Sequence, residues 1–84
     1  MNITSLIVDD EQLARELLRE YIEQTPELNV IGEAAKGKDA VEMIDTMKPD
    51  LIFLDVQMPG MNGFEVLDEI EHDPFVIFTT AYDQ

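Results

Sequence analysis

The chain has 84 residues, of which 19 are acidic and 5 are basic, so its formal net charge at pH 7 is -14. A chain of this length forms one small domain, and its charge disfavours binding to nucleic acid or to an anionic membrane, because phosphate groups would be repelled. The absence of cysteine excludes disulfide bonds and thiolate metal sites, the apolar runs are too short to cross a bilayer, and we expect the chain in the cytoplasm.

Apolar runs alternate with amphipathic stretches along the whole chain. Four short runs predict strands, at residues 3–8, 28–31, 51–54 and 75–80. Three segments between them carry apolar residues at helical spacing, namely Leu13, Leu17, Leu18, Tyr21 and Ile22, then Ala40, Val41, Ile44 and Met47, then Phe64, Leu67 and Ile70. We expect the three residues of the last segment to point inward. This alternation predicts an α/β fold with a doubly wound parallel sheet and right-handed crossovers.

Local signals mark the helix ends. Glu11 lies four residues before Arg15, a spacing typical of an ion pair along a helix. Asn62 is followed three residues later by Glu65, which predicts a capping box for the third helix. Prolines close the three helical segments, at positions 26, 49 and 74.

Three aspartates follow predicted strands at their carboxyl ends. Asp9 and Asp10 come after the first strand and Asp55 after the third. A strand order of 2-1-3-4 makes these two strands neighbours, so we expect the three carboxylates to converge. No basic residue adjoins them in the sequence to neutralise their charge. Clustered carboxylates take up protons or recruit a cation, and Mg²⁺, which prefers oxygen ligands, is the natural candidate.

A purely structural interpretation of Asp9 and Asp10 is also open, because acidic residues before a helix often cap it. Asp55 closes a continuous apolar strand and serves no helix end, so the three positions together favour a site. A strand-end aspartate beside Mg²⁺ can attack phosphorus and form an acyl phosphate. Such a site needs a hydroxyl near the phosphoryl oxygens, which Thr79 or Thr80 at the end of the fourth strand can provide.

Several motifs together resemble the receiver domain of two-component response regulators. They are Asp9-Asp10-Glu11, the segment Leu-Asp-Val-Gln-Met-Pro-Gly-Met-Asn-Gly at residues 54–63, and Thr80-Ala81. The segments Ile-Val-Asp-Asp-Glu-Gln-Leu-Ala-Arg and Phe-Thr-Thr-Ala-Tyr further resemble LytR/AlgR-type regulators. The resemblance covers the whole chain and implies a flavodoxin-like receiver fold with strand order 2-1-3-4.

The resemblance implies a specific role for each acidic residue. Asp55 matches the phosphoacceptor, while Asp9 and Asp10 match the Mg²⁺-binding acids. Asp55 and the backbone carbonyl of Gln57 would complete the protein ligands of the metal. A partner histidine kinase would donate the phosphoryl group, so the chain would be a phosphoacceptor with at most slow self-dephosphorylation and not an enzyme.

The resemblance also assigns residues around the phosphoacceptor. Thr80 matches the switch hydroxyl, and Ala81 matches the small residue that leaves room for the phosphoryl group. Pro59 and Gly60 would shape the loop after the third strand, and Gly63 would let the third helix begin close to it.

The chain departs from the family pattern at its C-terminal end. A receiver continues with a helix, a fifth strand that bears a phosphate-pairing lysine, and a last helix, whereas this chain stops at Gln84. We therefore expect residues 1–84 to be an incomplete receiver without that lysine, since no motif places Lys36, Lys38 or Lys48 in the site. The DNA-binding domain of LytR/AlgR-type regulators would also be missing, so we expect no nucleic-acid contact by this segment.

The fourth strand would then be an uncovered edge with a strongly apolar run over residues 75–78. An exposed apolar edge favours pairing with another chain, which predicts a homodimer or higher self-association through this strand. Two alternatives to a receiver remain. One is a Mg²⁺-dependent phosphohydrolase with an aspartyl nucleophile, although such enzymes carry an Asp-x-Asp pair after the first strand and Asp9 and Asp10 are adjacent. The other is a non-signalling, self-associating fragment.

Overall fold

Strands and helices alternate along the chain in the computed structural model, which describes residues 2–79. The elements in order are β1 (Ile3–Val8), α1 (Gln12–Glu23), β2 (Leu28–Ala34), α2 (Gly37–Met47), β3 (Leu51–Leu54), α3 (Gly63–Glu69) and β4 (Phe75–Phe78). None of the helices in this part of the chain is long and apolar enough to cross a membrane. Each predicted strand and helix is therefore present, with shifts of a few residues at the ends.

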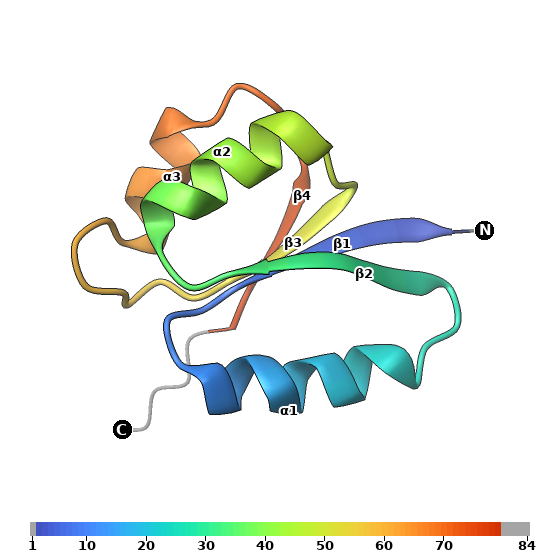
Figure 1. Ribbon diagram of the computed structural model, residues 1–84. Helices are drawn as coiled ribbons and strands as arrows, with labels where there is room; N and C mark the ends of the chain where they lie inside the picture. The colour runs from blue at the N-terminus through green and yellow to red at the C-terminus, as the bar shows by residue number, and fades with distance from the viewer. Residues whose placement is uncertain (1, 80–84) are drawn as a thin grey trace.

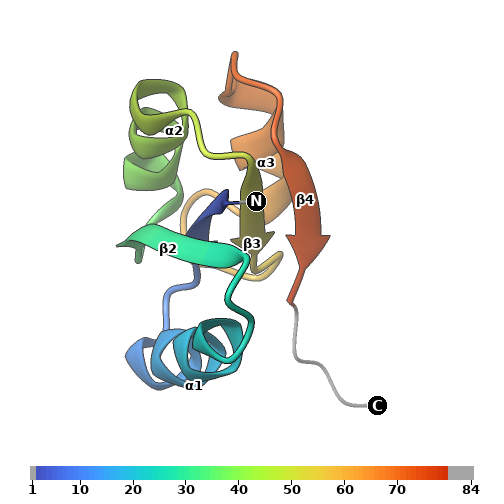
Figure 2. The same ribbon diagram turned by 90° about the vertical axis from the view of Figure 1, so that its right-hand side faces the viewer.

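The four strands form one parallel sheet in the order β2-β1-β3-β4. Helix α1 covers one face of this sheet, and α2 and α3 cover the other (Figures 1 and 2). This arrangement confirms the doubly wound α/β prediction and the strand order 2-1-3-4. It also places β1 and β3 side by side in the centre of the sheet, with β4 at an edge of its described part.

The two faces of the sheet carry separate apolar clusters. Leu6 and Val8 of β1 belong to the larger cluster under α2 and α3, whereas Ile7 between them belongs to the smaller cluster under α1. The same alternation holds along β3, where Phe53 joins the α1 side. Because side chains of successive strand residues point to opposite faces, β1 and β3 are buried on both sides, which fixes the positions of their carboxyl ends.

The inward orientation predicted for Phe64 is wrong. Its side chain is 55% exposed and packs against Phe78, with ring centroids 5.6 Å apart. Helix α3 is only seven residues long and turns Gly63 and Val66 toward the sheet, which leaves Phe64 on the outer side. The capping box predicted for this helix is confirmed, because the Asn62 side chain accepts a hydrogen bond from the Glu65 N–H at 2.9 Å and the Glu65 side chain accepts one from the Asn62 N–H at 2.8 Å.

Candidate functional site

The carboxyl ends of β1 and β3 bring three aspartates together. Val8 and Leu54 are paired in the sheet, and Asp9 and Asp55 follow them directly. The Asp55 N–H donates to the Val8 carbonyl at 2.9 Å, which extends the pairing of the two strands by one residue. One carboxylate oxygen each from Asp9, Asp10 and Asp55 lies within 4.8 Å of the others. The structure therefore brings together, at the carboxyl ends of the two central strands, the three acids that the sequence analysis singled out.

Two of these aspartates are held by the same local geometry. The Asp9 Oδ1 atom accepts a hydrogen bond from the Glu11 N–H at 2.9 Å, and the Asp55 Oδ1 atom accepts one from the Gln57 N–H at 3.2 Å. Both are turns in which an aspartate side chain bonds the backbone two residues later. The N-cap position of α1 is Glu11, whose side chain makes no capping bond. Asp9 thus organises the turn before α1 without occupying its N-cap.

The site concentrates negative charge in a partly dehydrated place. Asp9 and Asp55 are each 8% exposed, and Asp10 is half-buried. Burial raises the pKa of the Asp55 carboxyl, and the neighbouring charges of Asp9 and Asp10 raise it further. The hydrogen bond from the Gln57 N–H lowers this pKa, but the raising effects are larger. Among residues 2–79, the ion pairs formed by the two arginines go to glutamates and not to these three aspartates.

The three carboxylates fit a hydrated Mg²⁺ ion. They line a small pocket of about 180 Å³ together with Glu11, Ala14 and Gln57. Oxygens that share one Mg²⁺ lie up to about 4 Å apart, so small side-chain rotations bring the three carboxylate oxygens into range. Mg²⁺ keeps several of its water ligands when a few carboxylates bind it, and the open pocket leaves space for those waters.

The loop after β3 is shaped by two glycines. Gly60 has a φ of 80°, a backbone conformation that favours glycine. A Cβ atom on Gly63 would lie 2.6 Å from the Asp55 carbonyl oxygen and 3.0 Å from the Val56 Cα, and the Gly63 N–H donates to the Val56 carbonyl at 3.0 Å. The first turn of α3 therefore packs directly on the backbone that carries Asp55, with no space for a side chain.

The hydroxyl proposed for this site falls at the limit of the described residues. The Thr79 N–H donates to the Leu54 carbonyl at 3.0 Å, so the chain still runs beside β3 at this point. Thr80 and Ala81 lie outside the described residues.

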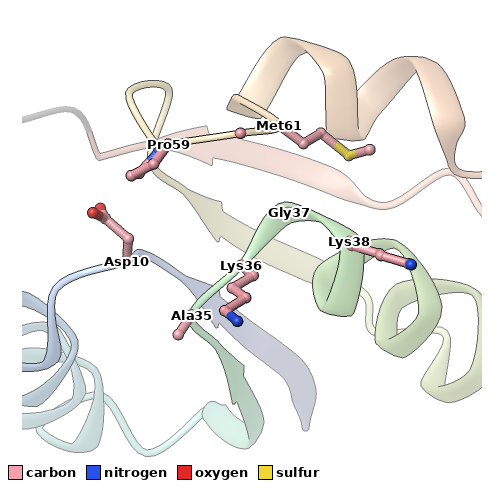
Figure 3. Close-up of a pocket in the computed structure, with 8 residues that line it drawn as sticks. Asp10, Ala35, Lys36, Gly37, Lys38, Pro59 and Met61 are labelled. Carbon is pink, nitrogen blue, oxygen red and sulfur yellow. The ribbon is translucent and has the colours of Figure 1, made fainter.

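A larger pocket of about 460 Å³ adjoins the acidic site and shares Asp10 with it. It lies between the segment after β2 and the loop after β3, and is lined by Asp10, Ala35, Lys36, Gly37, Lys38, Pro59, Gly60 and Met61. Figure 3 shows the Asp10 carboxylate pointing toward Pro59, whereas the amino groups of Lys36 and Lys38 point away from it. Neither lysine is therefore aimed at the Asp10 carboxylate (Figure 3).

Arg15 contacts the backbone beside the acidic site, and the sequence analysis did not identify this contact. The ion pair predicted between Arg15 and Glu11 is wrong, because the guanidinium pairs with Glu33 on β2 at 3.0 Å. A second nitrogen of the same guanidinium donates to the backbone carbonyl of Asp9 at 2.9 Å. The spacing along one helix indicates partners on that helix, and no pattern in a single sequence identifies a partner on a strand 18 residues away.

Comparison of the sequence with known proteins identifies the family that its motifs resemble. The family model described as the response regulator receiver domain matches residues 5–84. The sensory transduction protein LytT of Bacillus anthracis is 46% identical over 82 residues, which cover 94% of this chain and 33% of that protein. The transcriptional regulatory protein BtsR of Escherichia coli K12 is 38% identical over 84 residues, which cover 98% of this chain and 35% of that protein. The chain thus spans about a third of the length of such curated relatives.

Solved structures give the same result for the fold. The response regulator domain of Thermotoga maritima CheB superposes with a TM-score of 0.86 at 39% identity, over 93% of this chain and 60% of that one. The signal receiver domain of the putative response regulator NarL from Mycobacterium tuberculosis superposes with a TM-score of 0.87 at 32% identity, over 99% of this chain and 69% of that one.

Proposed function

This chain belongs to the response regulator receiver domain family, whose members are phosphoacceptor modules of two-component signalling, and we propose that Asp55 is the residue on which it accepts the phosphoryl group. The observation that carries the proposal is the position of Asp55, which is held at the end of a central strand within 4.8 Å of two further carboxylates. We propose a histidine kinase as the donor.

The chemistry is a transfer between two nucleophiles. A carboxylate oxygen of Asp55 attacks the phosphorus, an O–P bond forms, and the P–N bond to the donor imidazole breaks with the electron pair left on nitrogen. The Gln57 N–H bond at 3.2 Å holds the Asp55 carboxylate in a fixed orientation for this attack. The barrier of such a transfer is lowered chiefly by positioning of the reacting groups and by neutralisation of the negative charge on the phosphoryl oxygens. The site therefore has to supply a positive charge.

Asp9, Asp10, Asp55 and the backbone carbonyl of Gln57 are the groups that we propose to hold Mg²⁺. When bound, the ion neutralises charge on the phosphoryl oxygens. Without it, three carboxylates would repel an incoming phosphoryl group. Thr80 and Ala81 remain our proposal for the hydroxyl and the small residue beside the phosphoryl group.

We propose that the chain receives a phosphoryl group and does not turn over a separate substrate. The adjacent pair Asp9-Asp10, with the candidate nucleophile on another strand, lacks the Asp-x-Asp arrangement of an aspartyl phosphohydrolase. The relative named as a transcriptional regulatory protein supports a role in regulating transcription, and we propose that the chain acts in the cytoplasm. With a net charge of -14, these 84 residues themselves are not expected to contact nucleic acid.

Helix α1 offers a surface for the phosphoryl donor. Leu13, Leu17 and Tyr21, spaced four residues apart, are exposed and form a stripe along the helix. The helix begins two residues after Asp10, so one end of the stripe lies beside the acidic site. Apolar residues exposed in a row mark interaction surfaces in soluble domains. We propose that a helical segment of the donor packs on this stripe and thereby presents its phosphohistidine to Asp55.

A second proposal concerns assembly. In the described sheet β4 pairs with β3 on one side only, and three of its four side chains are exposed, with Phe75 at 82%. An exposed strand edge presents unpaired N–H and C=O groups to another chain. We propose that two copies of this chain associate through the β4 edge, which places the exposed side chains of Phe75, Ile77 and Phe78 beside those of the partner strand.

Phosphorylation by a small acyl phosphate tests the proposed function without a kinase. We expect the intact mass of the chain to rise by one phosphoryl group when Mg²⁺ is present and to stay unchanged when the metal is chelated. Asp55→Asn should abolish the increase, while Asp68→Asn, a matched change at an exposed position on α3, should leave it intact. A phosphorylated Asp55→Asn variant would contradict the assignment.

A further inference from the structure

Arg15 connects α1 both to β2 and to the strand end that carries the acids. Its Nη1 atom donates to the backbone carbonyl oxygen of Asp9 at 2.9 Å, and its Nε atom donates to Glu33 Oε1 at 3.0 Å. Its side chain is only 16% exposed, so water competes little for these bonds. We propose that Arg15 is a positioning residue of the metal site, which sets the direction of the Asp10 carboxylate by holding the Asp9 carbonyl. This inference rests on the proposed function.

The backbone of Asp9 is fixed at both of its polar groups. Its N–H donates to the Ala34 carbonyl at 3.1 Å, and its carbonyl accepts from Arg15. Because a peptide unit is planar, fixing the Asp9 carbonyl fixes the plane that leads to the N–H and Cα of Asp10. The Asp9 carboxylate is held separately by the Glu11 N–H. Arg15 therefore acts mainly on the placement of Asp10.

Glu33 anchors Arg15 in turn. It lies on β2 opposite Ile7 of β1, and its two carboxylate oxygens accept from Arg15 at 3.0 Å and from Arg19 at 2.7 Å. Burial works to raise the pKa of the Glu33 carboxyl, but the bonds and charges of the two arginines hold it below its usual range. Glu33 thus stays ionised at neutral pH and keeps the Arg15 guanidinium in place.

Positioning and simple charge make opposite predictions for this residue. Arg15 carries a positive charge close to the metal site, so its removal should strengthen cation binding if only Coulomb forces matter. A loss of positioning should weaken it. Arg19 provides the matched control, because it carries the same charge and bonds the same Glu33 but makes no bond to Asp9.

The test is a Mg²⁺ titration of the 84-residue chain, followed through the amide resonances of Asp9, Asp10 and Asp55. We expect Arg15→Gln to raise the dissociation constant about tenfold, as is typical when an outer-shell partner is removed. Arg15→Lys keeps the charge but loses the planar fork that reaches two acceptors, so we expect a loss of affinity there as well. Arg19→Gln should bind Mg²⁺ within about twofold of the unaltered chain, because Arg19 bonds Glu33 but makes no bond to Asp9.

A second readout needs no metal. The Asp10 amide resonance of the metal-free protein should move in both Arg15 variants and stay in place in Arg19→Gln. Unchanged or tighter Mg²⁺ binding in Arg15→Gln and Arg15→Lys would overturn the inference, as would an equal loss in Arg19→Gln. If Arg15→Gln does not fold, Arg15→Lys carries the test alone. An unaltered chain that binds no Mg²⁺ at the three aspartates would overturn the metal site itself.

Discussion

Gly63 and Asp55 lie in direct backbone contact, so that a Cβ atom on Gly63 would be 2.6 Å from the Asp55 carbonyl oxygen. Gly63→Ala should therefore push the start of α3 away from β3. We expect a loss of roughly 1–3 kcal/mol in the free energy of unfolding, as is typical of overpacking, with slower phosphorylation of Asp55. Chemical denaturation and phosphorylation rates measure the two effects. Gly32→Ala is the control, because its Cβ would meet side-chain atoms and no backbone, the end of Met43 at 2.9 Å and Leu6 Cδ1 at 3.1 Å. A loss there as large as at Gly63 would refute this account.

The charge of Asp55 should destabilise the metal-free protein. Burial and the charges of Asp9 and Asp10 raise the pKa of Asp55 above its value in the unfolded chain. The ionised group therefore costs stability above the raised pKa, and the cost disappears as the pH falls toward the unfolded value. We expect Asp55→Asn to raise the melting temperature at pH 7, with a gain that shrinks on acidification. A lower melting temperature for Asp55→Asn than for the unaltered chain at pH 7 would contradict the prediction.

Self-association should depend on the β4 edge. Ile77→Lys places a charge on this edge, a change that natural sheets use against pairing, and we expect it to shift the chain toward monomer in light scattering. Leu13→Lys alters another exposed apolar residue, on α1 and away from β4, and should leave the dimer in place. Because the net charge of -14 opposes association and salt screens it beyond about 8 Å at 0.15 M, the dimer should strengthen with ionic strength. A monomer at all salt concentrations would refute the proposal.

Donor recognition should depend on the stripe on α1. Leu17→Glu removes the central apolar residue of Leu13, Leu17 and Tyr21, all exposed in the structure. We expect slower transfer from a phosphorylated histidine kinase, by about tenfold or more if the residue is a central contact, and an unchanged rate with a small acyl phosphate. Ile77→Lys serves as the control. Equal slowing with both donors would mean that the substitution disturbs Asp55 itself.

Much of the fold was predictable because the central strands are short, apolar and bounded by charged or turn residues. The apolar run at residues 51–54 ends at Asp55, and the run at residues 3–8 ends at Asp9. Because the carboxyl ends of neighbouring parallel strands lie side by side, these two ends predict where the carboxylates meet. The capping box at Asn62 and Glu65 was equally predictable, because it depends on local spacing.

Features that depend on contacts between elements were not predictable. Phe64 has the spacing of an inward residue, but the orientation of α3 is set by the close approach of Gly63 to Asp55. Arg15 has an acidic residue four positions before it, Glu11 at the N-cap of its helix, but the sheet brings Glu33 to its guanidinium instead. In both cases a contact with another element of the fold decides the position of the side chain, and the local spacing does not.

The central claim, that Asp55 is the phosphoacceptor, is tested most directly by trapping the acyl phosphate. Borohydride reduces an aspartyl phosphate to homoserine, and mass spectrometry of peptides then locates the modified residue. After reaction with a small acyl phosphate and Mg²⁺, we predict homoserine at position 55 and none when the metal is chelated. Homoserine at Asp9 or Asp10, or a phosphoryl group that persists in Asp55→Asn, would contradict the claim.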